Sequence, residues 1–250
     1  MARTSENSAN LARKMLRLAD GLRERFGVPK RSRRGNLLDT LVQTLLSQST
    51  TDHNRDLAFG ELKRRFPDWD AVADASEGEV ASAIRSAGLG NQKAARILSF
   101  LLWLRDERGA LSLEFLREES DEAAVALLIR HNGIGIKTAY VTLMAASSRD
   151  LFPVDVHIHR IASRLGLIGE KINSEKAHGE LGPFVPEGRA FELHMNLLAF
   201  GRTICKARNP GCSECGFRRM CGYYRGLRDA RGAPAKTAAA RIKKKGKKKN

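Results

Sequence analysis

The chain has four cysteines, Cys205, Cys212, Cys215 and Cys221, spaced C-x6-C-x2-C-x5-C. Four thiolates this close together could hold a soft metal centre, and ligation lets a segment poor in apolar residues keep its shape. An iron-sulfur cluster, a zinc site and two disulfides all remain open. Disulfides are disfavoured because a basic chain without a secretory signal is expected in a reducing compartment. Since only one cysteine pair is short, the spacing favours iron-sulfur over zinc, whose ribbons usually provide two short knuckles.

A glycine-bearing turn joins two predicted helices at residues 131–138, which read H-N-G-I-G-I-K-T. Gly133 and Gly135 permit a tight hairpin whose amides, with the start of the next helix, could face a backbone phosphate. A turn of this kind also occurs as plain architecture between helices. It is not a Walker loop, because Ile136 and His131 stand where that motif requires glycine.

A lysine and a carboxylate follow these glycines, eighteen residues apart from each other. Lys137 lies in the first turn of a predicted helix, where the helix dipole disfavours the ammonium form. Its amine could form a Schiff base with an electrophilic carbon, or it could simply contact phosphate. Asp155 is placed to cap the helix from Val156 and also to stabilise positive charge developing on a sugar. His157 and His159 are interpreted as ordinary histidines, because no third ligand accompanies them.

The elements that must hold these residues are predicted to be helices. Apolar residues recur at spacings of three and four, and the period-two alternation of strands is almost absent. Asn36 is expected to cap one helix, and Ser120, followed by two acidic residues, to cap another. Further helical patterns fall at 94–104, 140–144, 158–167 and 181–200. The sequence therefore predicts an all-α fold.

The chain is strongly basic, with 44 Lys and Arg against 28 Asp and Glu, a net charge of +16. This charge favours a polyanion partner, and nucleic acid explains it better than a solubilising or membrane-binding surface does. No apolar stretch approaches the ~20 residues that cross a bilayer. Residues 226–250 carry ten basic residues and one acid, with little apolar content after Leu227. They are expected to form a disordered basic tail.

Five motifs occur together in one order: L-L-S-Q-S-T-T-D at 45–52, G-L-G-N-Q-K-A at 88–94, G-I-G-I-K-T-A at 133–139, V-D-V-H-I at 154–158, and the cysteine spacing after G-R-T-I. In this combination the chain resembles the endonuclease III family of DNA glycosylases, from roughly Leu37 to Tyr224. The resemblance implies a two-lobed, all-α helix-hairpin-helix DNA glycosylase fold. Residues 39–149 would form a six-helix barrel carrying the hairpin. Residues 1–38 and 150–225 would form a domain in which the four cysteines hold a [4Fe-4S] cluster.

The same resemblance implies a bifunctional DNA glycosylase and abasic-site lyase of base excision repair that removes oxidised pyrimidines. The damaged nucleotide would flip into the cleft between the lobes. Lys137 would attack C1′, expel the base and leave a Schiff base that eliminates the 3′ phosphate, assisted by Asp155. The alternative is a noncatalytic helix-hairpin-helix DNA-binding or redox-sensing iron-sulfur protein. The presence of both Lys137 and Asp155 counts against it.

The resemblance also implies a set of DNA contacts. Leu89 stands at the family's wedge position and would fill the stack beside the extruded base. Basic residues of the cysteine loop would position phosphates without reading sequence. The full expected set is Gln48, Ser49, Leu89, Gly133, Gly135, Lys206, Arg208, Arg218 and Arg219.

The chain departs from the family pattern at two places. His131 and Asn132 stand where the family usually has Leu-Pro. Ser49 stands where the family has a glutamine that fills the gap left in the DNA double helix by the extruded base. Gln48 lies one place earlier. Because serine is too short to bridge a vacated base position, we expect altered lesion specificity.

The expected partner is double-stranded DNA containing damaged bases or abasic sites, bound by a monomer without membrane association. The expected compartment is the cytoplasm, with the nucleoid, in a prokaryote, or the nucleus in a eukaryote.

Overall fold

The structure is a computed structural model that describes residues 5–31, 35–169 and 171–232. Every regular element in these residues is a helix. The α-helices are α1 (Ser5–Phe26), α2 (Leu37–Leu46), α3 (Asp52–Arg65), α4 (Trp69–Ala73), α5 (Glu77–Ala83), α6 (Gly90–Arg108), α7 (Asp121–Ile129), α8 (Ile136–Ser147), α9 (Val156–Leu165), α10 (Ser174–Leu181), α11 (Ala190–Thr203) and α12 (Gly222–Gly232). The 3-10 helices are η1 (Arg85–Ala87), η2 (Glu114–Arg117), η3 (Gly182–Phe184), η4 (Cys212–Glu214) and η5 (Arg218–Met220).

Three predicted helix starts are confirmed by their caps. Asn36, Ser120 and Asp155 each accept a hydrogen bond from the backbone N–H three residues further on. The distances are 2.9, 3.2 and 2.8 Å respectively. Each side chain thus satisfies one of the N–H groups that a helix start leaves without an intrahelical partner.

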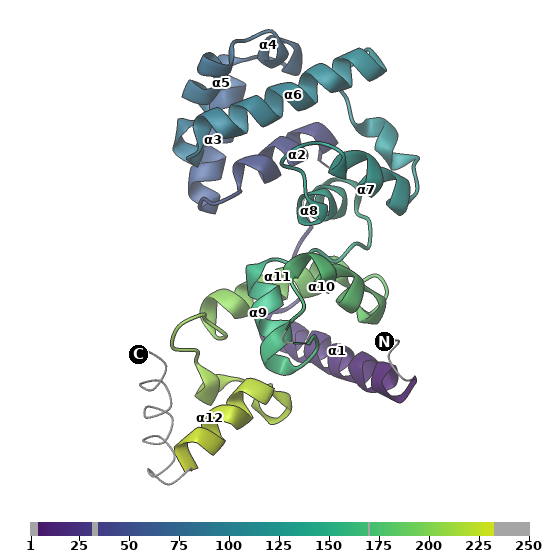
Figure 1. Ribbon diagram of the computed structural model, residues 1–250, viewed down its shortest axis with the longest axis vertical. Coiled ribbons are helices and arrows are strands. Elements are labelled where there is room, and N and C mark those ends of the chain that lie inside the picture. Colours follow the sequence, from purple (N-terminus) through teal and green to yellow (C-terminus); the bar gives the residue numbers. More distant parts are fainter. Residues whose placement is uncertain (1–4, 32–34, 170, 233–250) are drawn as a thin grey trace, which may run out of the picture.

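The helices form two lobes with separate apolar cores (Figure 1). The first core runs from Leu37 to Ala146 and is built by α2 to α8. The second joins Leu11–Leu22 of α1 to residues 152–221, so the N-terminal helix packs with α11 in the lower lobe. We propose that these two lobes are the two expected domains, 39–149 and 1–38 with 150–225, with one change at the boundary. Leu37 and Leu38 belong to α2 and to the first core, so the first domain is proposed to start at Leu37 rather than at residue 39.

The last described helix corrects one expectation. The sequence predicts disorder from Gly226 onward, but α12 continues to Gly232. This helix starts directly after the buried Cys221 and packs against α9. Because each residue added to an existing helical turn costs little, packing at its start carries the helix past Gly226. Residues 233–250 lie outside the described residues.

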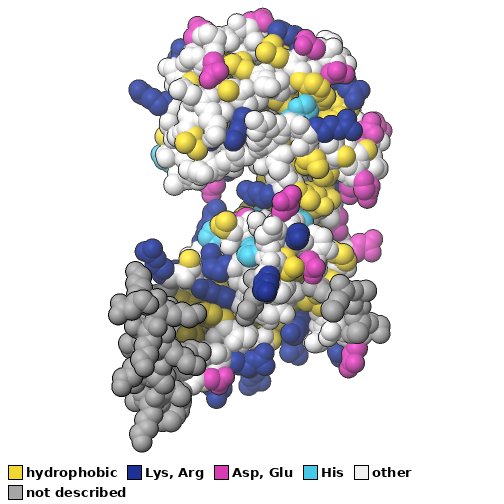
Figure 2. All heavy atoms as spheres, in the orientation of Figure 1, with side chains coloured by type: hydrophobic (Ala, Val, Ile, Leu, Met, Phe, Trp, Pro, Cys, Tyr) yellow, Lys and Arg dark blue, Asp and Glu magenta, His cyan; other side chains and the backbone are white. Residues whose placement is uncertain are grey.

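The molecule narrows where the two lobes meet (Figure 2). Tyr140 of α8 contacts His178 of α10 edge to face there, with ring centroids 5.2 Å apart. Arg202 of α11 forms an ion pair with Asp52 of α3 at 3.1 Å, which also joins the lobes. In the described part of the chain, no helix combines the length and apolarity needed to cross a bilayer.

Candidate functional site

Lys137 and Asp155 lie at the ends of two helices from different lobes, and both are near the buried His194. Lys137 lies in the first turn of α8, directly after the hairpin, and Asp155 is the N-cap of α9. Both side chains are half-buried. The charges of both act on the buried ring of His194 in α11, and that of Lys137 also acts on His178 in α10. One amine and one carboxylate therefore share a site with two imidazoles.

Two buried histidines hold the backbone that presents Asp155. His178 accepts the N–H of Val154 at Nε2, 2.9 Å away, and its Nδ1 lies 2.9 Å from the carbonyl oxygen of Ser174. The Nδ1 of His194 lies 3.0 Å from the carbonyl oxygen of Pro153. Since a carbonyl oxygen can only accept, Nδ1 carries the proton in both rings. The residues before Asp155 are thus fixed by one bond from α10 and one from α11.

Both rings are neutral at pH 7. Burial lowers the pKa of His194 to about 4, and it shifts the pKa of His178 in the same direction. A protonated His178 could not accept the Val154 N–H, so the bond itself requires the neutral ring. Sequence reasoning missed both residues, because their partners lie 24 and 41 positions away.

The hairpin is braced by Gln48, in the turn after α2, and by Arg96 of α6. Gly133 has φ of +85°, and a Cβ added there would lie 2.4 Å from Cδ of Arg96. Arg96 donates to Oε1 of Gln48 at 3.2 Å, and Nε2 of Gln48 donates to the carbonyl of Gly133 at 2.9 Å. Gly135 has φ of −86° and no atom near an added Cβ, so the amide end of α8 is open.

The braced hairpin changes the interpretation of three expected DNA contacts. Both ends of the Gln48 amide are used inside the protein, which gives this residue a bracing role. Glycine is favoured at Gly133 by its positive φ, and an added Cβ would also displace the Arg96 side chain that holds Gln48. At Gly135 the absence of a side chain leaves the start of α8 open, so that an anion can approach its N–H groups.

His131 accounts for part of the departure from the family's Leu-Pro pair. Its ring centroid lies 4.8 Å from that of Phe100 and 4.1 Å from that of Trp103. Its buried Nε2 has no hydrogen-bond partner among the described residues, and burial lowers its pKa. The imidazole therefore packs as an apolar side chain would, whereas Asn132 is exposed.

Ser49 and Leu89 form two exposed tips on the barrel lobe. Both are non-glycine residues in the left-handed region, with φ of 56° and 53°. Leu89 is 57% exposed although it is a large apolar residue. An exposed leucine at a turn is the kind of side chain that inserts between base steps.

The four cysteines lie together. All four line one cavity between α9, the end of α11 and α12, and none of them forms a disulfide. Burial raises the pKa of the Cys215 thiol, and the other three thiols raise it further. Arg164 of α9 fastens the loop by donating to Sγ of Cys205 at 3.4 Å and to the carbonyl of Lys206 at 2.7 Å. No pattern in the sequence indicates this role for Arg164.

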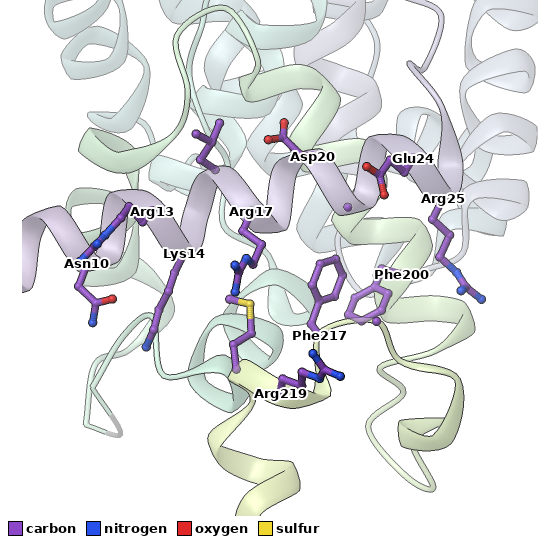
Figure 3. Close-up of a pocket in the computed structure, with 14 residues that line it drawn as sticks. Asn10, Arg13, Lys14, Arg17, Asp20, Glu24, Arg25, Phe200, Phe217 and Arg219 are labelled. Carbon is purple, nitrogen blue, oxygen red and sulfur yellow. The ribbon is translucent and has the colours of Figure 1, made fainter.

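The basic residues of the cysteine loop are all exposed: Lys206, Arg208, Arg218 and Arg219. Arg219 also lines a hollow of about 1210 Å³ formed with α1 (Figure 3). This hollow contains neither Lys137 nor Asp155. It is therefore distinct from the candidate catalytic site.

Comparison with known sequences identifies relatives over most of the chain. The family described as "HhH-GPD superfamily base excision DNA repair protein" matches residues 42–187. Endonuclease III of Thermotoga maritima is 30% identical over 208 residues, 83% of this chain and 92% of that protein. Endonuclease III of Sulfolobus acidocaldarius is 33% identical over 191 residues, 76% of this chain and 83% of that protein. A candidate DNA glycosylase of Arabidopsis thaliana is 37% identical over 180 residues, 72% of this chain, which spans 59% of that relative's length.

Solved structures show the same fold. The one titled "Structure of a non-covalent Endonuclease III-DNA Complex" has a TM-score of 0.74 at 22% identity, over 87% of this chain and 98% of that chain. A thermostable thymine-DNA glycosylase has a TM-score of 0.67 at 23% identity, over 88% of this chain and 98% of that chain. The chain belongs to the HhH-GPD superfamily of base excision DNA repair proteins. Within it, the chain is a member of the endonuclease III family, as its motifs predict.

Proposed function

We propose that the chain is a bifunctional DNA glycosylase and abasic-site lyase acting, as a monomer, on oxidised pyrimidines in double-stranded DNA. Membership of the superfamily supports a DNA glycosylase. The endonuclease III relatives support the proposal that it is a glycosylase of the bifunctional type. One observation carries the proposal: Lys137 and Asp155 both lie close enough to the buried His194 for their charges to act on it. An amine and a carboxylate placed together are what Schiff-base chemistry on a sugar requires.

In the proposed reaction, the neutral amine of Lys137 attacks C1′ of the extruded deoxyribose. The bond from C1′ to the base breaks, its electrons leave with the base, and the base takes up a proton. The amine loses one proton and the ring oxygen gains one as the ring opens, which leaves a protonated Schiff base between Nζ and C1′. Loss of a C2′ proton then breaks the C3′–O bond, and the 3′ phosphate leaves.

Asp155 is proposed to take the proton of the Lys137 ammonium and to stabilise the cationic sugar. Its Oδ1 accepts the N–H of Ile158, which fixes the carboxylate on the start of α9. A charge held in this way needs little reorganisation when positive charge develops nearby. The neutral state of His178 and His194 adds no competing positive charge to the site.

The four cysteines are proposed to hold a [4Fe-4S] cluster. They line one cavity, so their thiolates can converge on one centre. The choice of a cluster over zinc rests on the cysteine spacing, which has one short pair where zinc ribbons usually have two, and on the endonuclease III relatives. Cys205, Cys212, Cys215 and Cys221 would hold the cluster, which would cross-link the loop. Lys206, Arg208, Arg218 and Arg219 of this loop are proposed to contact phosphate.

Borohydride trapping tests the proposed function. The native chain and Lys137→Ala are incubated with duplexes holding thymine glycol, a plain abasic site or undamaged thymine. We expect a covalent adduct with the first two substrates in the native chain only, while Lys137→Ala still binds both. Base release without an adduct would mean a monofunctional glycosylase. Binding without base release or strand cleavage would favour the noncatalytic alternative.

A further inference from the structure

Lys93 is a buried lysine that the proposed reaction does not use. It lies in the first turn of α6 and its side chain is 2% exposed. Its Nζ donates to the carbonyl of Leu46 at 2.7 Å and to the carbonyl of Ala87 at 2.8 Å. Both partners are backbone oxygens, and burial lowers the pKa of the ammonium. An apolar side chain at this position would avoid the cost of desolvating an ammonium group. What a lysine provides here, and an apolar side chain does not, is the two hydrogen bonds.

The two carbonyls lie at the bases of the two exposed tips. Leu46 is the last residue of α2, three positions before Ser49, and Ala87 ends η1, two positions before Leu89. Both tip residues have left-handed backbone angles that are unfavourable for side chains with a Cβ. Such conformations persist only when the surrounding structure holds them. The Lys93 ammonium thus links the backbone segments that precede the two tips, through the carbonyls of Leu46 and Ala87.

We infer that Lys93 is a positioning residue that fixes the Ser49 tip and the Leu89 tip relative to each other. When a nucleotide is extruded, Leu89 then enters the base stack beside it while the Ser49 tip faces the vacated position. This inference rests on the proposed function, because only an enzyme that extrudes nucleotides needs these two tips at a set spacing. It adds a residue to the extrusion step and none to the chemistry at C1′.

The test compares Lys93→Met with Ile97→Ala. Methionine fills a similar volume without donating hydrogen bonds, and Ile97, buried in the same helix, controls for lost core stability. The first readout is the fluorescence of 2-aminopurine placed beside a tetrahydrofuran abasic analogue in a duplex, at saturating protein. The second is the abasic-site lyase rate on duplex relative to single-stranded DNA, where no extrusion is needed.

We expect Lys93→Met to lose most of the fluorescence increase and to lower the duplex lyase rate by about tenfold or more, since small misplacements have effects of this size. Its single-strand rate should stay within about twofold of native. Ile97→Ala, compared at matched fractions of folded protein, should keep the native fluorescence and the native rate ratio. Equal losses in both variants, or a full fluorescence increase in Lys93→Met, would overturn the inference.

A double variant tests whether Lys93 acts through the Leu89 tip. Adding Lys93→Met to Leu89→Ala should cost less than the two separate losses combined, because both changes remove the same insertion. Fully additive losses would contradict the inference. The fluorescence readout needs no catalysis, so it stands even if Lys137 forms no adduct, and the two failures can be told apart.

Discussion

A single carboxylate at position 155 starts a helix and is proposed to serve the reaction, and the two roles can be separated. Asn is as good an N-cap as Asp, so Asp155→Asn should keep α9 and change the free energy of unfolding little. It should lower the lyase rate by about 100-fold or more, because the charge and the proton acceptor are removed. Asp155→Ala should in addition cost about 1 kcal/mol of stability through loss of the cap.

For both Asp155 variants, the lyase rate is measured on an abasic duplex and the free energy of unfolding is measured in urea. A native lyase rate in Asp155→Asn would mean that the residue is only a cap.

The buried His194 makes stability depend on pH. Its folded pKa is about 4, against 6.5 for a free imidazole, so between these values the unfolded chain binds more protons than the folded one. The free energy of unfolding should therefore fall as pH is lowered from about 7 to 4, by up to about 3 kcal/mol from this residue. His194→Asn keeps an amide donor for the Pro153 carbonyl and should make this fall shallower.

Urea unfolding at several pH values measures the slope for His194→Asn. His53→Asn, at an exposed position, controls for the loss of an imidazole as such. If His194→Asn and the native protein had the same slope, protonation of His194 would not be the cause of the pH dependence.

The hairpin between α7 and α8 contains two glycines that serve different purposes. Gly133→Ala places a methyl group on Arg96 at a positive φ, and should destabilise the protein by about 1–3 kcal/mol. Gly135→Ala is compatible with its backbone angle, and should cost less than about 1 kcal/mol. It should instead weaken binding of an abasic duplex, because the methyl group obstructs the open start of α8. Thermal melts and fluorescence anisotropy separate the two effects, and equal melting losses would contradict this account.

Among the elements, those with a local cause are predictable from the sequence. The caps of α2, α7 and α9 are visible there because donor and acceptor lie three residues apart. The pattern of α1 is also visible, since its buried residues recur at spacings of three and four, although no helix is predicted there: Leu11, Met15, Leu18 and Leu22. The contacts of Lys93, His178 and His194 span 47, 24 and 41 positions. Nothing local marks such pairs, because only the fold brings them together.

Across the whole molecule, the number of DNA phosphates that basic residues neutralise sets how DNA affinity responds to salt. Residues 233–250 hold eight Lys and Arg and no acid, which is half of the net charge of +16. Removing them should weaken nonspecific duplex binding and flatten the plot of log affinity against log salt, by about 0.9 for each phosphate that they neutralise. Titrations by anisotropy at several salt concentrations measure this slope. An unchanged slope would show that these residues do not contact DNA.

The proposed reaction depends on one bond, between Nζ of Lys137 and C1′ of a deoxyribose. Its most direct test is mass spectrometry of the borohydride-reduced reaction after digestion of protein and DNA. We expect the peptide containing Lys137 to carry the mass of the reduced sugar fragment. A sugar found on another amine, or on none while the strand is cleaved, would contradict the account.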